Sequence, residues 1–358
     1  MTRNITDSLL EILKEIDENG EVIIARGQEQ REVLSKLTKI ERPYERFLVL
    51  PGRNNNVFAQ IAETAWVLAG RDDLSFLSHY LPRASDFSDD GKTWRAAYGP
   101  RIRRWGGQID QVKEVVERLR EDPFTKRAVA SIFDPSSDFI ETRDVPCNNW
   151  LQFIQREGKL DLHVTVRAND AIWGFSGINF FEWSVLHEIV ACSLGWELGT
   201  LSWYVGSFHV YARHYKVANR LRVLEGFRSP YEVGVPATRI ETTSDHLDDV
   251  LTQIFDAESF ARVGSFAEAL AIEKNIADPF FRRAATMLRL YNAHLLGQER
   301  AEILGILGEL DDSDFFSAAA EYLGRAWGDY ALIPIPTGPQ STFFKIFHAT
   351  REYQLTVV

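Results

Sequence analysis

The stretch Leu160-Asp-Leu-His-Val-Thr-Val-Arg167 alternates apolar and polar side chains without a break. Because successive side chains of a strand point to opposite faces of a sheet, this period of two predicts a strand with one buried face. Similar strand-like runs occupy residues 128–133, 150–154 and 198–206, and a short apolar run occupies residues 21–25. We therefore expect a sheet built from at least these segments.

Segments with helical periodicity alternate with the strand-like runs. Apolar residues recur every three or four positions over residues 9–16, 57–68 and 109–119, which is the spacing of one helix face. Thr6 or Asp7 is expected to cap the first helix, because both are favoured N-cap residues.

The stretch 179–193 is too long for a strand and apolar on most sides, so it predicts a buried central helix. Helices that lean on a sheet bury the apolar stripe of each helix against one sheet face. The pattern predicts an α/β (α+β) protein with a mixed sheet flanked by helices.

The chain divides into three parts by pattern. Residues 1–242 carry the mixed strand and helix signals, whereas the signal from about 243 to 328 is continuously helical. The proline-rich segment 333–339 then breaks the helical pattern. We expect a catalytic core over 1–242, an added C-terminal α-helical subdomain over 243–328, and a tail over 329–358 that returns to the core.

Composition excludes several classes of protein. The chain has 358 residues, of which 45% are hydrophobic and 25% charged, with a net charge of −11; these shares are typical of a folded globular protein. The negative charge repels polyanions, so a long nucleic acid is not expected as a partner. An anionic ligand must then be small and held in a local basic pocket.

Compartment and membrane association follow from similar features. The chain has two cysteines, too few for a disulfide framework, and shows no signal-peptide pattern at its start. We therefore expect it in the cytoplasm. The run 178–196 comes nearest to a membrane span, but it carries Glu182, His187 and Glu188. No membrane association is therefore expected.

Cys147 is the candidate nucleophile. It stands between two strand candidates, where a turn would present the thiol at a sheet end. A lone cysteine is more often a small buried hydrophobe, and Cys192, inside the apolar helix, fits that interpretation. Arginines at strand ends or turns could bind a phosphate and lower the pKa of the Cys147 thiol. They are Arg26, Arg127 and Arg167.

Six short motifs follow one another between residues 21 and 216. In order, they are Ala62-Glu-Thr-Ala-Trp-Val-Leu-Ala-Gly70, Tyr98-Gly99 with Arg103, Asp122-Pro-Phe-Thr-Lys-Arg127, Pro146-Cys147 with Gln152-Phe153, Arg167-Ala-Asn-Asp170 with Trp173-Gly174, and Gly206-Ser-Phe-His-Val-Tyr-Ala-Arg-His214. They resemble the motifs of the thymidylate synthase superfamily, the folate-dependent C5 methylases and hydroxymethylases of pyrimidine nucleotides. The resemblance implies the fold of that family.

The resemblance also implies a mechanism. Cys147 would add to C6 of a pyrimidine nucleoside monophosphate and make C5 nucleophilic. Arg167 would favour the thiolate and contact the substrate phosphate, and Glu63 would transfer protons through water near the base. The co-substrate would be 5,10-methylene-tetrahydrofolate, with Asp170 and Gly174 at the pterin ring. No metal ion is implied.

Further residues receive substrate roles from the resemblance. Arg26, Lys126 and Arg127 would complete a phosphate cradle, with Lys126 and Arg127 reaching the site of the partner subunit. This arrangement implies a homodimer with shared active sites. His209 and Tyr211 would hydrogen-bond a sugar hydroxyl.

Two departures from the family bear on the product. Counting back from Tyr98-Gly99, Ala84 and Phe87 take the places of a tryptophan pair that packs against the folate and keeps the site dry. A small residue and a smaller ring would admit water, which gives a hydroxymethyl product rather than a methyl product. Trp94 or Trp173 could instead refill the gap.

Other departures bear on the base. Asn148, Ser207 and Ala168 replace a histidine, an aspartate and a serine of the family. Asn179 takes the base-reading role if one residue is inserted before it; otherwise Ile178 faces the base edge. A side-chain amide can rotate to read either cytosine or uracil.

We expect a CMP or dCMP 5-hydroxymethylase, because several polar positions of the methylases are replaced. Two alternatives stay open. One is a thymidylate synthase that methylates dUMP, and the other is a non-catalytic nucleotide-binding homologue.

Overall fold

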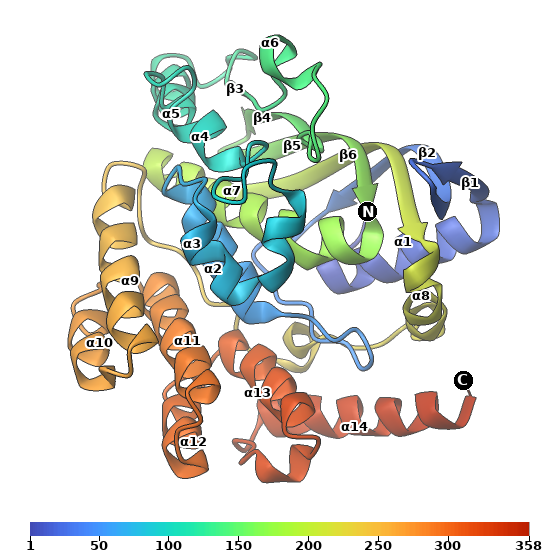
Figure 1. Cartoon of the computed structure of the whole chain (residues 1–358), viewed down its shortest axis with the longest axis vertical. Coiled ribbons are helices and arrows are strands. Elements are labelled where there is room, and N and C mark those ends of the chain that lie inside the picture. Colours follow the sequence, from blue (N-terminus) through green and yellow to red (C-terminus); the bar gives the residue numbers. More distant parts are fainter. Residues whose placement is uncertain (358) are drawn as a thin grey trace.

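Within residues 1–357, which the computed structural model describes, the strands form one six-stranded sheet (Figure 1). The spatial order is β1-β2-β6-β5-β4-β3, and every neighbouring pair is antiparallel except β5 and β6. The predicted mixed sheet is thus confirmed. The strands are β1 (Glu21–Ala25), β2 (Gln28–Ile40), β3 (Val129–Ser131), β4 (Asn148–Arg156), β5 (Lys159–Asp170) and β6 (Glu197–Tyr211).

β5 shows why the alternating pattern predicts the sheet. Leu160, Leu162, Val164 and Val166 are fully buried or nearly so, and the residues between them are not. Helices α1 (Ile5–Asn19) and α7 (Phe180–Leu194) pack against the sheet. The buried side of β5 therefore belongs to the core.

α7 is the buried central helix that the apolar run predicts. Its residues are buried from Phe180 to Ala191, and Gly195 ends it in the left-handed region with a φ of 66°. A π-helical segment, η2 (Ala171–Asn179), leads into it. Such widened turns are frequent at functional sites.

Two local predictions differ from the structure. The N-cap of α1 is Asn4, whose Oδ1 accepts from the backbone N of Thr6 at 3.0 Å and of Asp7 at 3.4 Å. Thr6 and Asp7 are therefore inside the helix. β2 was not expected, because its sequence is rich in charged residues and Ser35, with a φ of 56°, interrupts its period.

Six further α-helices lie before residue 243. They are α2 (Val57–Leu68), α3 (Leu74–Tyr80), α4 (Tyr98–Arg103), α5 (Gln111–Glu121), α6 (Pro135–Asp138) and α8 (Tyr215–Arg222). α2 packs on α7 and η2, which places one face of α2 beside the end of the sheet.

The C-terminal third is helical, as the sequence predicts; in Figure 1 it is coloured from yellow-orange to red. Its helices are α9 (Leu247–Arg262), α10 (Phe266–Glu273), α11 (Pro279–Leu295), α12 (Arg300–Gly308), α13 (Asp314–Ala326) and α14 (Pro339–Val357). Phe58 of α2 packs against Tyr291 and Tyr322, with ring centroids 4.9 and 4.8 Å apart. Gln354 of α14 donates to the backbone oxygens of Pro51 and Arg220.

The division into core, subdomain and tail stays a prediction, because the helical block packs on core helix α2. Within residues 1–357, no helix is both long and apolar enough to cross a membrane.

Candidate active site

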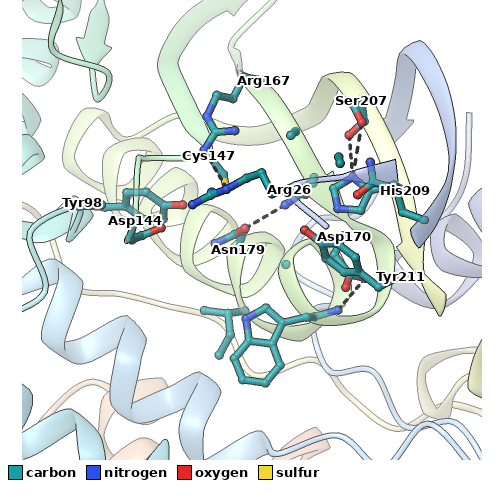
Figure 2. A pocket seen from close by; sticks show the side chains of 18 of the residues that line it. Arg26, Tyr98, Asp144, Cys147, Arg167, Asp170, Asn179, Ser207, His209 and Tyr211 are labelled. Carbon is teal, nitrogen blue, oxygen red and sulfur yellow. Dashed lines mark hydrogen bonds between the residues drawn. The ribbon is translucent and has the colours of Figure 1, made fainter. Parts of the chain in front are cut away.

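A cavity of about 430 Å³ opens where the ends of β5 and β6, the β1–β2 turn, α2 and η2 meet (Figure 2). It gathers most of the residues that the sequence singles out. These are Arg26, Glu63, Cys147, Arg167, Asp170, Gly174, Asn179, His209 and Tyr211. Segments far apart in the chain thus build one site.

Cys147 and Arg167 form the centre of this cavity. Cys147 directly precedes β4, and the backbone N of Arg167 on β5 donates to its carbonyl oxygen at 2.9 Å. The guanidinium of Arg167 donates to the backbone oxygens of Pro146 at 2.9 Å and Val145 at 2.7 Å. Its Nη2 also lies 3.8 Å from the Cys147 Sγ.

The pKa of the Cys147 thiol is raised overall, although nearby cations oppose the rise. Burial raises the pKa of Cys147, Arg167 opposes this rise most strongly, and Arg26 opposes it to a smaller degree. The thiolate is the reactive form of cysteine. A cation beside Sγ stabilises the thiolate and so makes this buried thiol more reactive.

Only part of the expected phosphate cradle lies in this cavity. Arg26, in the β1–β2 turn, lines it together with Arg167. Lys126 and Arg127 follow α5 and line a separate surface hollow beside Phe124. Within one chain, therefore, the structure does not bring the second pair of cations to Cys147.

Glu63 reaches the cavity from α2. Its side chain is buried, with the residue 8% exposed, and its Oε2 has no hydrogen-bond partner among the described residues. Burial raises the pKa of Glu63 well above its ordinary value, and the charges of Glu182 and Asp144 add to the rise. A carboxyl whose pKa is raised in this way is suited to general acid and base catalysis.

The two carboxylate oxygens of Asp170 have different surroundings. Its Oδ1 accepts from the backbone N of Ile172 at 2.7 Å and of Trp173 at 3.2 Å, which caps η2. Its buried Oδ2 has no hydrogen-bond partner among the described residues, and His214 Nε2 lies 4.0 Å from it. A buried unpaired acceptor favours a ligand that donates an N–H.

Gly174 is required by close packing. A Cβ at this position would lie 2.4 Å from Nδ2 of Asn169. Any other residue would push on Asn169 and on the neighbouring Asn179, so Gly174 acts on the cavity wall through these amides.

His209 and Tyr211 lie side by side at the end of β6, with ring centroids 4.8 Å apart (Figure 2). Nδ1 of His209 lies 3.2 Å from the backbone oxygen of Ser207. Burial lowers the pKa of His209, which favours a neutral ring. Arg213 stacks over Tyr211 at 4.1 Å, so the pair presents polar atoms beside a cation.

Ala84 and Phe87 do not line the cavity. Both belong to a short 3-10 helix, η1 (Pro82–Phe87), and Ala84 is fully buried. Trp94 stacks in parallel on Phe87, with centroids 5.6 Å apart, and takes the place that faces the cavity. Counting back along the sequence placed Ala84 and Phe87 in the cavity wall. In the structure Trp94, from the loop between η1 and α4, occupies that position instead.

Aromatic side chains therefore still wall this part of the cavity. Trp66 and Trp173 line it together with Trp94. Nε1 of Trp94 donates to Asp144, which fixes the ring.

Asn179 and Ile178 both line the cavity, so the two alternatives for the base-reading position lie side by side. Oδ1 of Asn179 accepts from Asn169 Nδ2 at 3.2 Å, and its Nδ2 donates to Glu182 Oε2 at 3.4 Å. The amide thus has a partner on each side.

Sequence reasoning missed two acidic residues of the site. Asp144 lines the cavity, and Glu182 lies directly behind Asn179. A signal existed for Glu182, since an ionisable residue in an apolar buried helix needs a functional or structural reason.

Comparison with known proteins gives a consistent result. A family model described as thymidylate synthase matches residues 7–272. The chain is similar to the deoxyuridylate hydroxymethyltransferase of Bacillus phage SP01, with 33% identity over 300 residues that cover 74% of this chain and 77% of that protein.

Two further relatives extend the comparison. The deoxyuridylate hydroxymethyltransferase of Pseudomonas phage M6 is 31% identical over 343 residues, which cover 90% of this chain and 93% of that protein. The thymidylate synthase of Bacillus licheniformis is 32% identical over 147 residues, which cover 40% and 52%.

Proposed function

The chain belongs to the thymidylate synthase family, and from this premise we propose that it converts deoxyuridylate to its 5-hydroxymethyl derivative. It is a one-carbon transferase with 5,10-methylene-tetrahydrofolate as co-substrate. One observation carries the proposal: Cys147, Arg167 and Glu63 share a cavity in a chain similar to two deoxyuridylate hydroxymethyltransferases over most of its length.

Cys147 begins the reaction. Its thiolate adds to C6 of the pyrimidine, so a C–S bond forms, the C5–C6 double bond opens, and C5 becomes a carbon nucleophile. Arg167 stabilises the thiolate from 3.8 Å. Arg167 and Arg26, both lining the cavity, are the cations of this chain that we assign to the phosphate.

Residues on the other side of the cavity fit the folate. Oδ2 of Asp170, which has no hydrogen-bond partner among the described residues, suits an N–H of the pterin ring. The indoles of Trp66, Trp94 and Trp173 offer apolar walls. When bound, the folate would supply the one-carbon unit that becomes attached to C5. The C5 proton then leaves to solvent, and the bond between the one-carbon unit and the folate nitrogen breaks with its electron pair, which releases reduced tetrahydrofolate and leaves a methylene group on C5.

Water completes the proposed reaction. A water oxygen bonds to the methylene carbon, its proton passes through solvent to Glu63 or bulk water, and the electron pair of the methylene double bond moves to C5. The C5–C6 double bond then re-forms as the C–S bond breaks with its electron pair returning to sulfur. The names of the phage relatives support this outcome over methylation. The substitutions at Ala84 and Phe87 give it no support, since neither residue lines the cavity.

The same relatives support the proposed base and sugar. Their names specify deoxyuridylate, whereas the expectation of CMP or dCMP has no support from the comparisons. A cytidine monophosphate remains the second candidate, because the amide of Asn179 could read either base after rotation. We assign His209 and Tyr211 to the sugar.

The proposal includes a homodimer with shared sites. Lys126 and Arg127 lie outside the cavity of their own chain, which is consistent with their reaching a partner's site. Leu34 and Leu37 of β2 and Tyr204 of β6 are exposed large side chains on paired strands. A second copy would cover this apolar surface.

Product analysis tests the function. The protein is incubated with 5,10-methylene-tetrahydrofolate and separately with dUMP, UMP, dCMP or CMP, and the nucleotide masses are read. We expect a gain of CH₂O on dUMP without oxidation of the folate. A gain of CH₂ with dihydrofolate formed would identify a methylase, and absence of both product and C5 proton exchange would identify a binding protein.

A further inference from the structure

The amide of Asn179 is held from both sides by protein groups. Asn169 donates to its Oδ1 at 3.2 Å, and Glu182 accepts from its Nδ2 at 3.4 Å. An amide oxygen has two acceptor positions and an amide nitrogen has two protons. One acceptor position and one proton of Asn179 therefore remain for a ligand in the cavity.

The two pyrimidine bases present these partners in opposite order. Uracil offers a donor at N3 and an acceptor at O4, whereas cytosine offers an acceptor at N3 and a donor at its exocyclic amine. Rotating the amide of Asn179 by half a turn exchanges Oδ1 and Nδ2. The orientation of this amide therefore selects the base.

Glu182 is placed to fix that orientation. It lies on α7 and is 1% exposed, and the only hydrogen bond of its carboxyl group in the described structure is the one from Asn179. An ionised carboxylate accepts but cannot donate. A rotated amide would put its oxygen against the carboxylate, which leaves two buried acceptors facing each other.

We propose that Glu182, in its ionised form, is a positioning residue that sets the base specificity of this site by holding the Nδ2 side of Asn179. It does not line the cavity and acts through Asn179. The inference rests on the proposed function, which takes uracil as the base.

The effect of Glu182 on the orientation of Asn179 should depend on pH. Burial raises the pKa of Glu182 to about 8. Glu63 on α2 and Tyr98 on α4 interact electrostatically with Glu182, and Asp144, before β4, acts on both of them. Below its pKa the protonated Glu182 can also donate to a rotated amide, so the preference for one base should sharpen as pH rises through this range.

The experiment compares kcat/KM for dUMP and dCMP in the wild type and in Glu182→Gln. Glutamine has nearly the same shape but can either donate or accept, so both amide orientations become available. We expect the dUMP-to-dCMP ratio of the wild type above pH 8 to fall on the order of 10-fold in the variant, the effect of one misplaced buried hydrogen-bonding pair.

A matched control lies on the same helix. Glu188 is equally buried but pairs with Arg46 and Arg239 instead of Asn179. Glu188→Gln should leave the base ratio unchanged even if it lowers stability.

A pH series on the same proteins gives a second readout. The wild-type ratio should rise with pH, and the ratio of Glu182→Gln should be flatter; the variant also corrects for ionisation of uracil itself. If Glu182→Gln does not fold, Glu182→Ala removes the same partner of Asn179 Nδ2 and should give the same fall in the base ratio.

Each outcome has one meaning. Equal losses on both bases, or a wild-type ratio that does not change with pH, would overturn the role of Glu182 while leaving the proposed function intact. Failure of the wild type to turn over any pyrimidine nucleotide would instead overturn the proposed function.

Discussion

Nη2 of Arg167 lies 3.8 Å from Sγ of Cys147, and the same guanidinium is held by the backbone oxygens of Val145 and Pro146. The position of the cation is thus set by the turn that carries the thiol. Because these contacts need no ligand, the charge beside the nucleophile is in place before substrate arrives.

Replacement of Cys147 by alanine should abolish product formation and C5 proton exchange. The covalent step is lost, but Arg26 and Arg167 still line the cavity, so nucleotide binding should persist. Calorimetric titration with dUMP alongside the activity assay checks both parts. Full activity in the variant would exclude Cys147 as the nucleophile.

Replacement of Arg167 by alanine should raise the pKa of the Cys147 thiol, because Arg167 is the strongest influence that lowers it. The pH midpoint of alkylation of this thiol should therefore move upward, with less thiolate at neutral pH. Cys192, the other cysteine of the chain, is changed to serine in all samples so that one thiol reports.

Arg26→Ala is the matched control for this shift. Arg26 contributes less to the Cys147 pKa, so its loss should move the alkylation midpoint less and act mainly on the KM for nucleotide. Equal shifts in the two variants would mean that Arg167 has no special role at the thiol.

Mixing Cys147→Ala and Arg127→Ala chains should restore activity if the site is shared. Each homodimer lacks one required group, whereas a heterodimer has one complete site. Activity is measured after subunit exchange, with each variant alone as the control. No recovery, in samples where mass spectrometry detects heterodimers, would place Arg127 outside the partner's site.

Ala84→Trp should lower stability without switching the product. Ala84 is fully buried away from the cavity, and inserting a large ring into a packed position costs about 1–3 kcal/mol. The thermal midpoint should fall, and the ratio of hydroxymethyl to methyl product should stay constant. A shift of that ratio toward methyl would show that position 84 controls water access.

The sequence predicts parts of the fold that depend on one face being buried. Val164 and Val166 alternate with polar neighbours, so the strand that contains them could be recognised. β2 could not, because its charged side chains border the cavity and solvent rather than a core; Glu32, for example, lines the cavity.

Some residues of the candidate site could also be predicted from the sequence, and others could not. Cys147 and Asp170 stand inside recognisable motifs and are found in the cavity. The position of Trp94 in the cavity wall could not be found by counting residues along the sequence. Its stacking on Phe87 is a tertiary contact. The hydrogen bond between Asn179 and Glu182 also requires the turn from η2 into α7.

The reaction of dUMP and 5,10-methylene-tetrahydrofolate in water enriched in heavy oxygen tests the central claim most directly. If Cys147 activates C5 and water completes the transfer, the nucleotide should gain a hydroxymethyl group that carries the heavy oxygen, the folate should remain reduced, and Cys147→Ala should give no product. A methylated nucleotide without heavy oxygen, formed together with dihydrofolate, would contradict this account.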